Sequence, residues 1–149
     1  MKSALLPAIV AATLAACATA DRLSPAEELE ATLSDVRLGE RTDRVCFKRG
    51  IDGFRDAKDR TVVVRRGVND DYLLVMRSCP QLDRAQLIGF VDGFSGSCLT
   101  RNDRVAVSES SFALRGPGQI GPTTCFVDAI YRWNEDAAEE APAALDQSD

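Results

Sequence analysis

The chain has 149 residues, of which 45% are hydrophobic and 28% charged. This balance is typical of one ordinary globular domain rather than a disordered or fibrous protein. The formal charge of -5 is unevenly distributed: residues 41–133 contain 15 Lys/Arg against 11 Asp/Glu, whereas residues 18–40 and 134–149 are acidic. The sequence therefore predicts a mildly basic domain between two acidic arms.

The N-terminus has the pattern of a lipoprotein signal. Lys2 supplies a positive charge, and residues 4–16 form an apolar segment that is too short for a stable membrane span. Leu14-Ala15-Ala16-Cys17 resembles the bacterial lipobox, in which the cysteine is acylated and becomes the first residue of the mature protein. A simple secretory signal that contains this cysteine by chance is the alternative. We expect residues 1–16 to be the signal peptide.

Lipid attached to Cys17 would determine where the domain is located. Several acyl chains on one residue anchor a protein stably, whereas a single chain binds a membrane only marginally. Ala18 rather than Asp follows the cysteine, which favours the outer membrane by resemblance to the sorting rule of enteric bacteria. We expect an exported protein that is anchored in the cell envelope and faces the periplasm. No second apolar run is near the ~20 residues of a transmembrane helix.

Residues 17–40 are expected to form the lipidated N-terminus and an acidic tether that contains one short helix. Ser24 is a candidate N-cap, Pro25 fits the first helical position, and Glu27 completes a capping box. Gly39 is available to end the helix. The apolar residues of this segment share one narrow face, which either docks on the domain or remains part of a loose tether. They are Ala26, Leu29, Leu33 and Val36.

Residues 41–133 are predicted to form an α+β domain that is mostly antiparallel β, as a small disulfide-stapled sheet or partly open barrel with one or two short helices. Gly and Asn between two apolar runs favour a hairpin over Thr61–Arg77. Pro80–Gly89 is the main helical candidate, because a proline suits a helix start and the apolar residues share a face. Residues 134–149 are expected to be a disordered acidic tail. The predicted strands are Arg44–Arg49, Thr61–Arg66, Asp71–Arg77, Asp103–Val107 and Thr123–Trp133.

The last predicted strand has apolar residues on both faces, which favours a central position in the sheet. Trp133 is better explained as a lid on the core than as a platform for a ligand, because it lies where the strand ends. Strict alternation places Phe126 and Ile130 on one face, and Cys125, Val127, Ala129, Tyr131 and Trp133 on the other.

The domain retains four cysteines besides the lipidated one: Cys46, Cys79, Cys98 and Cys125. An even number in a small exported domain predicts two disulfides. No C-x-x-C pair suggests a redox site, and a zinc site would need four dispersed thiolates in an oxidising compartment. Two pairings are considered: Cys46–Cys79 with Cys98–Cys125, and Cys46–Cys98 with Cys79–Cys125. Loop closure contributes roughly 4 kcal/mol per bridge in either pairing, so it does not choose between them. We favour the second pairing, because it ties the start and middle of the domain to its other half.

The domain also contains a set of short cysteine-centred and apolar motifs. They are Cys46-Phe47, Thr61-Val62-Val63-Val64, Tyr72-Leu73-Leu74, Cys79-Pro80-Gln81-Leu82 followed by Ala85 and Ile88, Cys98-Leu99, and Cys125-Phe126-Val127 followed by Ile130. In cysteine spacing and hydrophobic pattern these motifs resemble a group of short Gram-negative envelope lipoproteins known only as a domain of unknown function. The resemblance implies an exported, disulfide-bonded lipoprotein domain and supplies no activity or catalytic residue.

The chain lacks histidine, which removes the common Ser-His and Cys-His nucleophile pairs and the usual general base near neutral pH. Residues 93–97 superficially resemble a nucleophile elbow, but Ser occupies the fifth position and no base partner exists. Ser95 and Ser97 are therefore better explained as loop residues. Asp52 and Asp92 are the carboxylate pair that a glycan hydrolase would use, although an aspartate before glycine usually forms a turn.

The remaining polar motifs give no specific cofactor or metal site. Asn69-Asp70-Asp71 and Asn102-Asp103 offer oxygen ligands, but neither has the ligand density of a calcium loop, and turn formation is the stronger interpretation. We predict no cofactor and no metal.

The basic residues of the domain are mostly arginines, which suit bidentate contacts with phosphate or carboxylate. Nucleic acid is not a sensible partner in the periplasm, so lipid headgroups, lipopolysaccharide and acidic peptide stems are the candidate anions. Arginine on exposed strand faces is also an ordinary solubilising choice. The residues concerned are Arg65, Arg66, Arg101, Arg104 and Arg115.

The sequence as a whole favours a non-catalytic, membrane-anchored envelope lipoprotein that binds or scaffolds another envelope component. One alternative is a small periplasmic hydrolase that uses carboxylates. Another is a binder of anionic lipid or glycan through the arginines. The expected partners are the membrane, through the lipid anchor, and an envelope protein or an anionic glycan or lipid.

Overall fold

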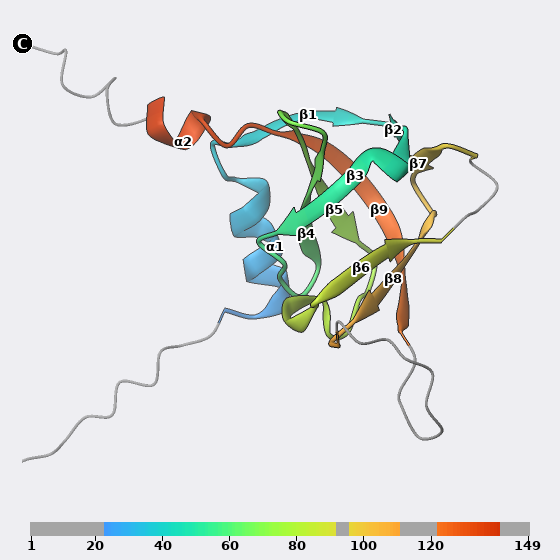
Figure 1. The fold of residues 1–149 in the computed structure, drawn as a ribbon. Helices are drawn as coiled ribbons and strands as arrows, with labels where there is room; N and C mark the ends of the chain where they lie inside the picture. Colours follow the sequence, from blue (N-terminus) through green and yellow to red (C-terminus); the bar gives the residue numbers. More distant parts are fainter. Residues whose placement is uncertain (1–22, 92–95, 111–121, 141–149) are drawn as a thin grey trace, which may run out of the picture.

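The structure, a computed structural model, describes residues 23–91, 96–110 and 122–140. Figure 1 shows the arrangement of its elements. The helices are α1 (Pro25–Leu33) and α2 (Ala137–Glu140), and the short 3-10 helices are η1 (Lys48–Gly50) and η2 (Leu82–Arg84). The strands are β1 (Leu38–Thr42), β2 (Arg44–Cys46), β3 (Ile51–Arg55), β4 (Thr61–Arg66), β5 (Asp70–Met76), β6 (Leu87–Phe90), β7 (Cys98–Thr100), β8 (Arg104–Ser108) and β9 (Thr123–Trp133).

Most of the strands form one antiparallel sheet in the order β3-β4-β5-β9-β8-β6. β9 is 11 residues long, so its first part pairs with β8 and its last part with β1, while β5 pairs along the opposite edge. The sheet curls into a nearly closed barrel whose two ends are β3 and β6 (Figure 1). β2 and β7 pair separately. The predicted class, mostly antiparallel β with a partly open barrel, is confirmed.

Two clusters of buried side chains lie on the two faces of this sheet. Because β4 and β5 are covered on both faces, their sequences are continuous apolar runs rather than alternating ones. The barrel interior holds Val45, Val62, Val64, Tyr72, Leu74, Met76, Leu82, Leu99, Val105, Val107, Val127 and Ile130, with Cys79 and Cys125. The outer cluster holds Val63, Leu73, Val75, Ala129 and Trp133.

Helix α1 begins as the sequence predicts. Ser24 is the N-cap, and it forms a capping box with Glu27: the Glu27 N–H donates to Ser24 Oγ at 3.4 Å, and the Ser24 N–H donates to Glu27 Oε2 at 2.9 Å. The helix ends at Leu33, however, so the predicted stop at Gly39 is wrong. Gly39 instead lies in β1, where a Cβ would come within 3.1 Å of Cβ of Arg132. The close approach of β1 to β9 therefore favours glycine, because a larger residue would force Arg132 to shift by a few tenths of an ångström.

The face by which α1 docks is shifted from the predicted one. Leu29 packs against the outer cluster, and Thr32 is buried and accepts a hydrogen bond from Lys58 Nζ at 3.1 Å. Leu33 and Val36 are exposed. The helix therefore docks on the domain through a narrow contact that is partly polar.

Strand β9 changes phase at Asp128. The β5–β9 register shifts between Val75 and Met76, so one residue of β9 is extra and the strand carries a β-bulge. Val127 and Ile130 consequently both face the barrel interior, although strict alternation would separate them. The predicted division of this strand into two constant faces is wrong, whereas its central position is confirmed.

Pro80–Gly89 does not form the predicted helix. Only one 3-10 turn, Leu82–Arg84, is present, and the chain then becomes β6, which pairs with β8. Gln81 has a φ of 75° and Ala85 is extended, so the backbone leaves helical geometry on both sides of the turn. Apolar residues three apart fit a buried turn followed by a strand as well as a helix, and pairing with β8 outweighs a weak local propensity.

The other predicted strands are present with small shifts, and the predicted hairpin is the β4–β5 pair with Gly67 at positive φ in its turn. The predicted strand Arg44–Arg49 is shorter, because η1 begins at Lys48. The strands that the sequence does not predict are β1, β3, β6 and β7, all of five residues or fewer.

The structure contains the disulfides Cys46–Cys98 and Cys79–Cys125, which is the favoured pairing. The first joins β2 to β7 at residues that are directly opposite in the register. The second ties the segment after β5 to the start of β9, with both cysteines buried in the barrel interior. Each bridge thus connects distant parts of the chain.

Replacing Cys79 and Cys125 together by Ala should lower the free energy of unfolding by roughly 4 kcal/mol, because the bridge closes a loop with a sequence separation of 46. Urea unfolding followed by tryptophan fluorescence measures the loss. The matched control is the Cys46→Ala/Cys98→Ala variant, whose loop is similar but whose cysteines are only half-buried, and it should lose less. Four reactive thiols in the denatured, unreduced protein would contradict both bridges.

Candidate binding site

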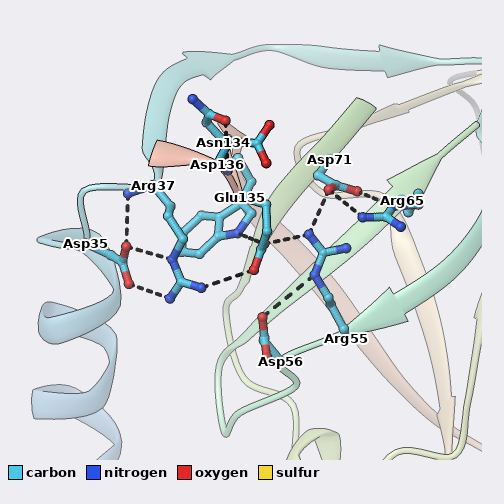
Figure 2. Close-up of polar contacts among 10 residues, drawn as sticks. Asp35, Arg37, Arg55, Asp56, Arg65, Asp71, Asn134, Glu135 and Asp136 are labelled. Carbon is cyan, nitrogen blue, oxygen red and sulfur yellow. Dashed lines mark hydrogen bonds and ion pairs between the residues drawn. The ribbon is translucent and has the colours of Figure 1, made fainter. Parts of the chain in front are cut away.

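Asp71 is the centre of a network of arginines and carboxylates on the outer side of the sheet (Figure 2). Its side chain is only 7% exposed. Arg65, directly opposite in the β4–β5 register, donates from Nε to Oδ1 at 2.9 Å and from Nη2 to Oδ2 at 3.0 Å. Arg55 of β3 donates from Nη2 to Oδ2 at 2.7 Å. Two guanidinium groups therefore compensate the burial of this carboxylate.

Glu135, which follows β9, joins the C-terminal arm to the same network. Its Oε2 accepts from Arg55 Nη2 at 2.7 Å and from Trp133 Nε1 at 3.0 Å. Arg37 donates to its Oε1 at 3.4 Å. Arg37 also donates three hydrogen bonds to the Asp35 carboxylate, from its backbone N–H, Nε and Nη2, and lies 4.6 Å from the centre of the Trp133 ring. The segments before β1 and after β9 are therefore held at one corner of the barrel (Figure 2).

The network lowers the pKa of three carboxyls, those of Asp35, Asp71 and Glu135. Hydrogen bonds from Arg37 lower the pKa of Asp35 to about 2. Burial by itself would raise the pKa of Asp71, but the hydrogen bonds from Arg65 and Arg55 outweigh it, and the pKa lies below 3.8. The hydrogen bond from Arg55 likewise lowers the pKa of Glu135. All three carboxyls are ionised at neutral pH, so the network is a set of ion pairs.

Parts of both predicted arms thus belong to the folded domain. β1 begins at Leu38, before the expected domain start at residue 41, and the Asn134 N–H donates to the C=O of Arg37 at 2.9 Å. Trp133 is 6% exposed and packs in the outer cluster, as a lid on the core would. The signal peptide, Cys17 and the last residues of the acidic tail lie outside the described residues.

Most of the arginines that suggested anion binding already pair with carboxylates of this chain. Arg104 is exposed in β8, and Arg115 lies outside the described residues. An external anion at the paired positions would have to displace a neighbouring carboxylate. The pairs are Arg65–Asp71, Arg66–Asp70 and Arg101–Asp128.

The motifs considered for calcium have structural roles. Asp70 and Asp71 bind arginines, as described above. Asp103 accepts hydrogen bonds from the Thr100 N–H at 2.6 Å and from its Oγ1 at 3.1 Å, and Asn102 has a φ of 70° in the same turn. In the ranges that the structure describes, no group of three acidic, cysteine or histidine side chains is placed to hold a metal ion.

Of the two carboxylates considered for hydrolysis, the structure describes only one. Asp52 is exposed in β3, and Asp92 and Ser95 lie outside the described residues. Ser97 is exposed, and its C=O accepts a hydrogen bond from the Lys48 N–H at 2.8 Å.

A groove of about 160 Å³ lies between the two ends of the sheet. We call it the interstrand groove. The residues that line it are Ile51, Asp52, Gly53 and Phe54 of β3, Val64 of β4, and Leu87, Ile88 and Phe90 of β6. Its walls are mostly apolar, and Leu87 at its rim is 45% exposed. It exists because β3 and β6 do not pair with each other.

A second hollow is larger but has different chemistry. It measures about 670 Å³ and is lined by residues of α1, the β3–β4 connection and the η2 region. Its charged side chains are of both signs and lie beside exposed surface, so it offers no consistent preference for a ligand. They are Glu28, Lys58, Asp59, Asp83 and Arg84. The interstrand groove is therefore the stronger candidate for a binding site.

The fold and the groove define a small disulfide-bonded, incompletely closed β-barrel with an apolar opening between its end strands. The chain belongs to a family of unknown function (DUF6491), whose model matches residues 1–149. The expectation of a family without an assigned function is confirmed. Searches of the curated proteins and of the solved structures give no match.

Sequence reasoning missed both features of this site. The interstrand groove depends on β3 and β6, two short strands that the sequence did not predict. The network depends on Glu135, which lay in the part expected to be a disordered tail. One signal in the sequence could have indicated the role of Glu135. It lies two positions after Trp133, close enough in the chain to accept a hydrogen bond from the indole N–H of that residue.

Asp71→Asn should lower the free energy of unfolding at pH 7 by roughly 1–3 kcal/mol, because it removes the negative charge and one of the two acceptor oxygens that the arginines bind. The folded-state pKa of Asp71 is depressed, so its stabilisation is present above pH 3.8 and is lost as the pH falls through the folded pKa. The difference between wild type and variant in urea unfolding should therefore stay constant from pH 7 to about pH 4 and shrink at lower pH.

Asp70→Asn is the matched control for this variant. Asp70 also pairs with arginine, but its side chain is 41% exposed, so the loss should stay below about 1 kcal/mol. Equal losses for the two variants, or a difference at Asp71 that does not change with pH, would contradict the role of the buried network.

Proposed function

We propose that this protein is a non-catalytic lipoprotein of the bacterial envelope, anchored through acylated Cys17, whose domain binds another envelope component in the interstrand groove. The lipobox-like sequence before Cys17 supports the anchor, and Ala18 favours the outer membrane. Two disulfides are in keeping with an oxidising compartment such as the periplasm. Among the described residues, no helix is long and apolar enough to cross a membrane.

The observation that carries the binding proposal is the apolar opening between β3 and β6. A concave apolar surface is the usual form of a binding site, and here it is built from side chains that pack on the barrel core. The paired arginines give less support to anion binding, because their charges are already neutralised within the chain. Scaffolding or binding through the interstrand groove is therefore the reading that we favour.

The anchor predicts the mass and the location of the mature protein. The native protein should begin at Cys17 and carry several fatty acyl groups, because the lipobox-like motif places the cleavage before that residue. Cys17→Ala should move the domain from the membrane fraction to the soluble fraction. Intact mass spectrometry and cell fractionation measure both effects. A mature chain that begins elsewhere, or a Cys17→Ala variant that stays in the membrane, would remove the anchor.

The interstrand groove predicts where a partner touches the domain. Benzoylphenylalanine introduced at Leu87 should form a photo-adduct in intact cells, whereas the same group at Phe126 should not. Phe126 is the matched control, because it is 42% exposed compared with 45% for Leu87 and belongs to β9, away from the lining of the groove. The captured partner, once purified, should bind wild type and Phe126→Glu equally.

The variant Leu87→Glu should bind the same purified partner at least about tenfold more weakly, because a charge at the rim must lose hydration on binding. Isothermal titration calorimetry measures the three affinities. Equal adducts from both positions, or unchanged affinity of Leu87→Glu, would refute the interstrand groove as the binding site.

A further inference from the structure

The outer edge of β6 directs backbone hydrogen-bonding groups into the opening between the sheet ends. The Val91 N–H donates to the C=O of Arg104 at 3.1 Å, and the β6–β8 register runs without a shift along β6. Antiparallel pairing alternates, so Gly89 has the same orientation as Val91 and bonds to β8. The peptide groups of Ile88 and Phe90 point the other way, towards the open edge.

Strand β3, at the other side of the opening, also directs a peptide group into it, but its edge is better protected against pairing with a further strand. In β4, Val63 and Arg65 direct their peptide groups away from β5, towards their partners Arg55 and Gly53 in β3. The peptide group of Phe54, which lies between these two partners, therefore points to the opening. The β3–β4 register shifts between Ile51 and Gly53, which places a bulge at the exposed Asp52. A bulge and charged side chains are the usual devices that prevent an edge strand from pairing further.

The edge of β6 has none of these devices. Its sequence, Leu87–Phe90, contains no charge and no proline, and its register has no bulge. A Cβ added to Gly89 would meet no atom within 4 Å, so among the described residues there is open space over the face of β6 at this position. Within the same ranges β8 is the only strand that pairs with β6. An unprotected apolar edge is a template for another strand.

The size and lining of the interstrand groove favour a peptide over a small molecule. Its volume of about 160 Å³ is below the roughly 300–1,000 Å³ of pockets that enclose small ligands. It has room for apolar side chains that enter while the rest of the ligand stays outside. Among the described residues, the N–H and C=O groups of Ile88 and Phe90 bond to no other strand. Such groups on every second residue match another extended backbone, which is the recognition used when a peptide adds to a sheet edge.

We infer that the interstrand groove binds an extended apolar peptide segment of a partner protein, which adds to the outer edge of β6 as a further strand. The inference rests on the proposed function and names the chemical class of its partner. The peptide groups of Ile88 and Phe90 hydrogen-bond to the backbone of the added strand. Its alternate apolar side chains enter the groove next to Phe54 and Ile88, and the others lie beside Leu87.

A library of random short peptides, selected on the full mature protein, tests this inference. Enriched peptides should be apolar at alternating positions. They should bind Ile88→Pro about tenfold more weakly than wild type, because proline removes an N–H from the open edge. This N–H takes no part in pairing with β8, and edge strands tolerate proline at such positions. The control Ile88→Val keeps the N–H and most of the side chain, and should bind as wild type does.

The same test is made from the ligand side, so that it does not depend on the folding of Ile88→Pro. N-methylation of alternate amides of an enriched peptide should weaken its binding to wild-type protein about tenfold when the methylated amides face β6. Methylation of the intervening amides should leave the affinity unchanged. Equal effects of the two methylation patterns, or a wild-type protein that enriches no peptide, would overturn the inference.

The outcomes separate this inference from the proposed function. If Leu87→Glu weakens binding of the photo-captured partner but Ile88→Pro leaves its affinity unchanged, the groove binds a partner without strand addition, and only the inference is overturned. If neither variant affects the partner, the proposed function fails as well. Concentration-dependent dimers in analytical ultracentrifugation that Ile88→Pro abolishes would assign the edge to a second copy of this chain and overturn the inference.

Discussion

The pairing of β9 with three other strands is the constraint on which the fold depends. This strand contacts β5 along one edge and β8 and β1 along the other, and a disulfide fixes its start at Cys125. The bulge at Asp128 rotates its second half, so the same strand contributes first to the barrel interior and then to both clusters. One strand thereby links the barrel to the face that α1 covers.

The ionic network completes this arrangement at the other end of β9. Its energetic contribution is limited by desolvation, because burying the Asp71 carboxylate offsets much of the attraction from Arg55 and Arg65. Its geometry is more important, since it connects residues that precede β1 with Glu135 beyond Trp133 (Figure 2). The network therefore places the two ends of the domain relative to the barrel more than it adds to stability.

The sequence predicts those parts of the fold whose signals are local. The capping box at Ser24 and the β4–β5 hairpin depend on residues within a few positions of each other, and both form as expected. The segment Pro80–Gly89 becomes a turn and a strand because β8, nearly 20 residues away, supplies its pairing partner. The bulge at Asp128 also has no local signature, because it depends on the register that β5 imposes. The candidate binding site inherits this limit, since both strands that form the interstrand groove are defined by their neighbours.

The open edge of β6 is connected to the proposed anchor by the energetics of weak binding. The interstrand groove is small, and a few backbone hydrogen bonds contribute only about 0.5–1.5 kcal/mol each, so such a site binds a free partner weakly. A lipid on Cys17 would confine the domain to the same surface as an envelope partner, and linkage of this kind raises effective concentration without any new contact. An unprotected strand edge is also a hazard for a freely diffusing protein, because it pairs with any extended chain. Confinement by the proposed anchor would limit the chains that the edge meets, which would make the edge usable for binding.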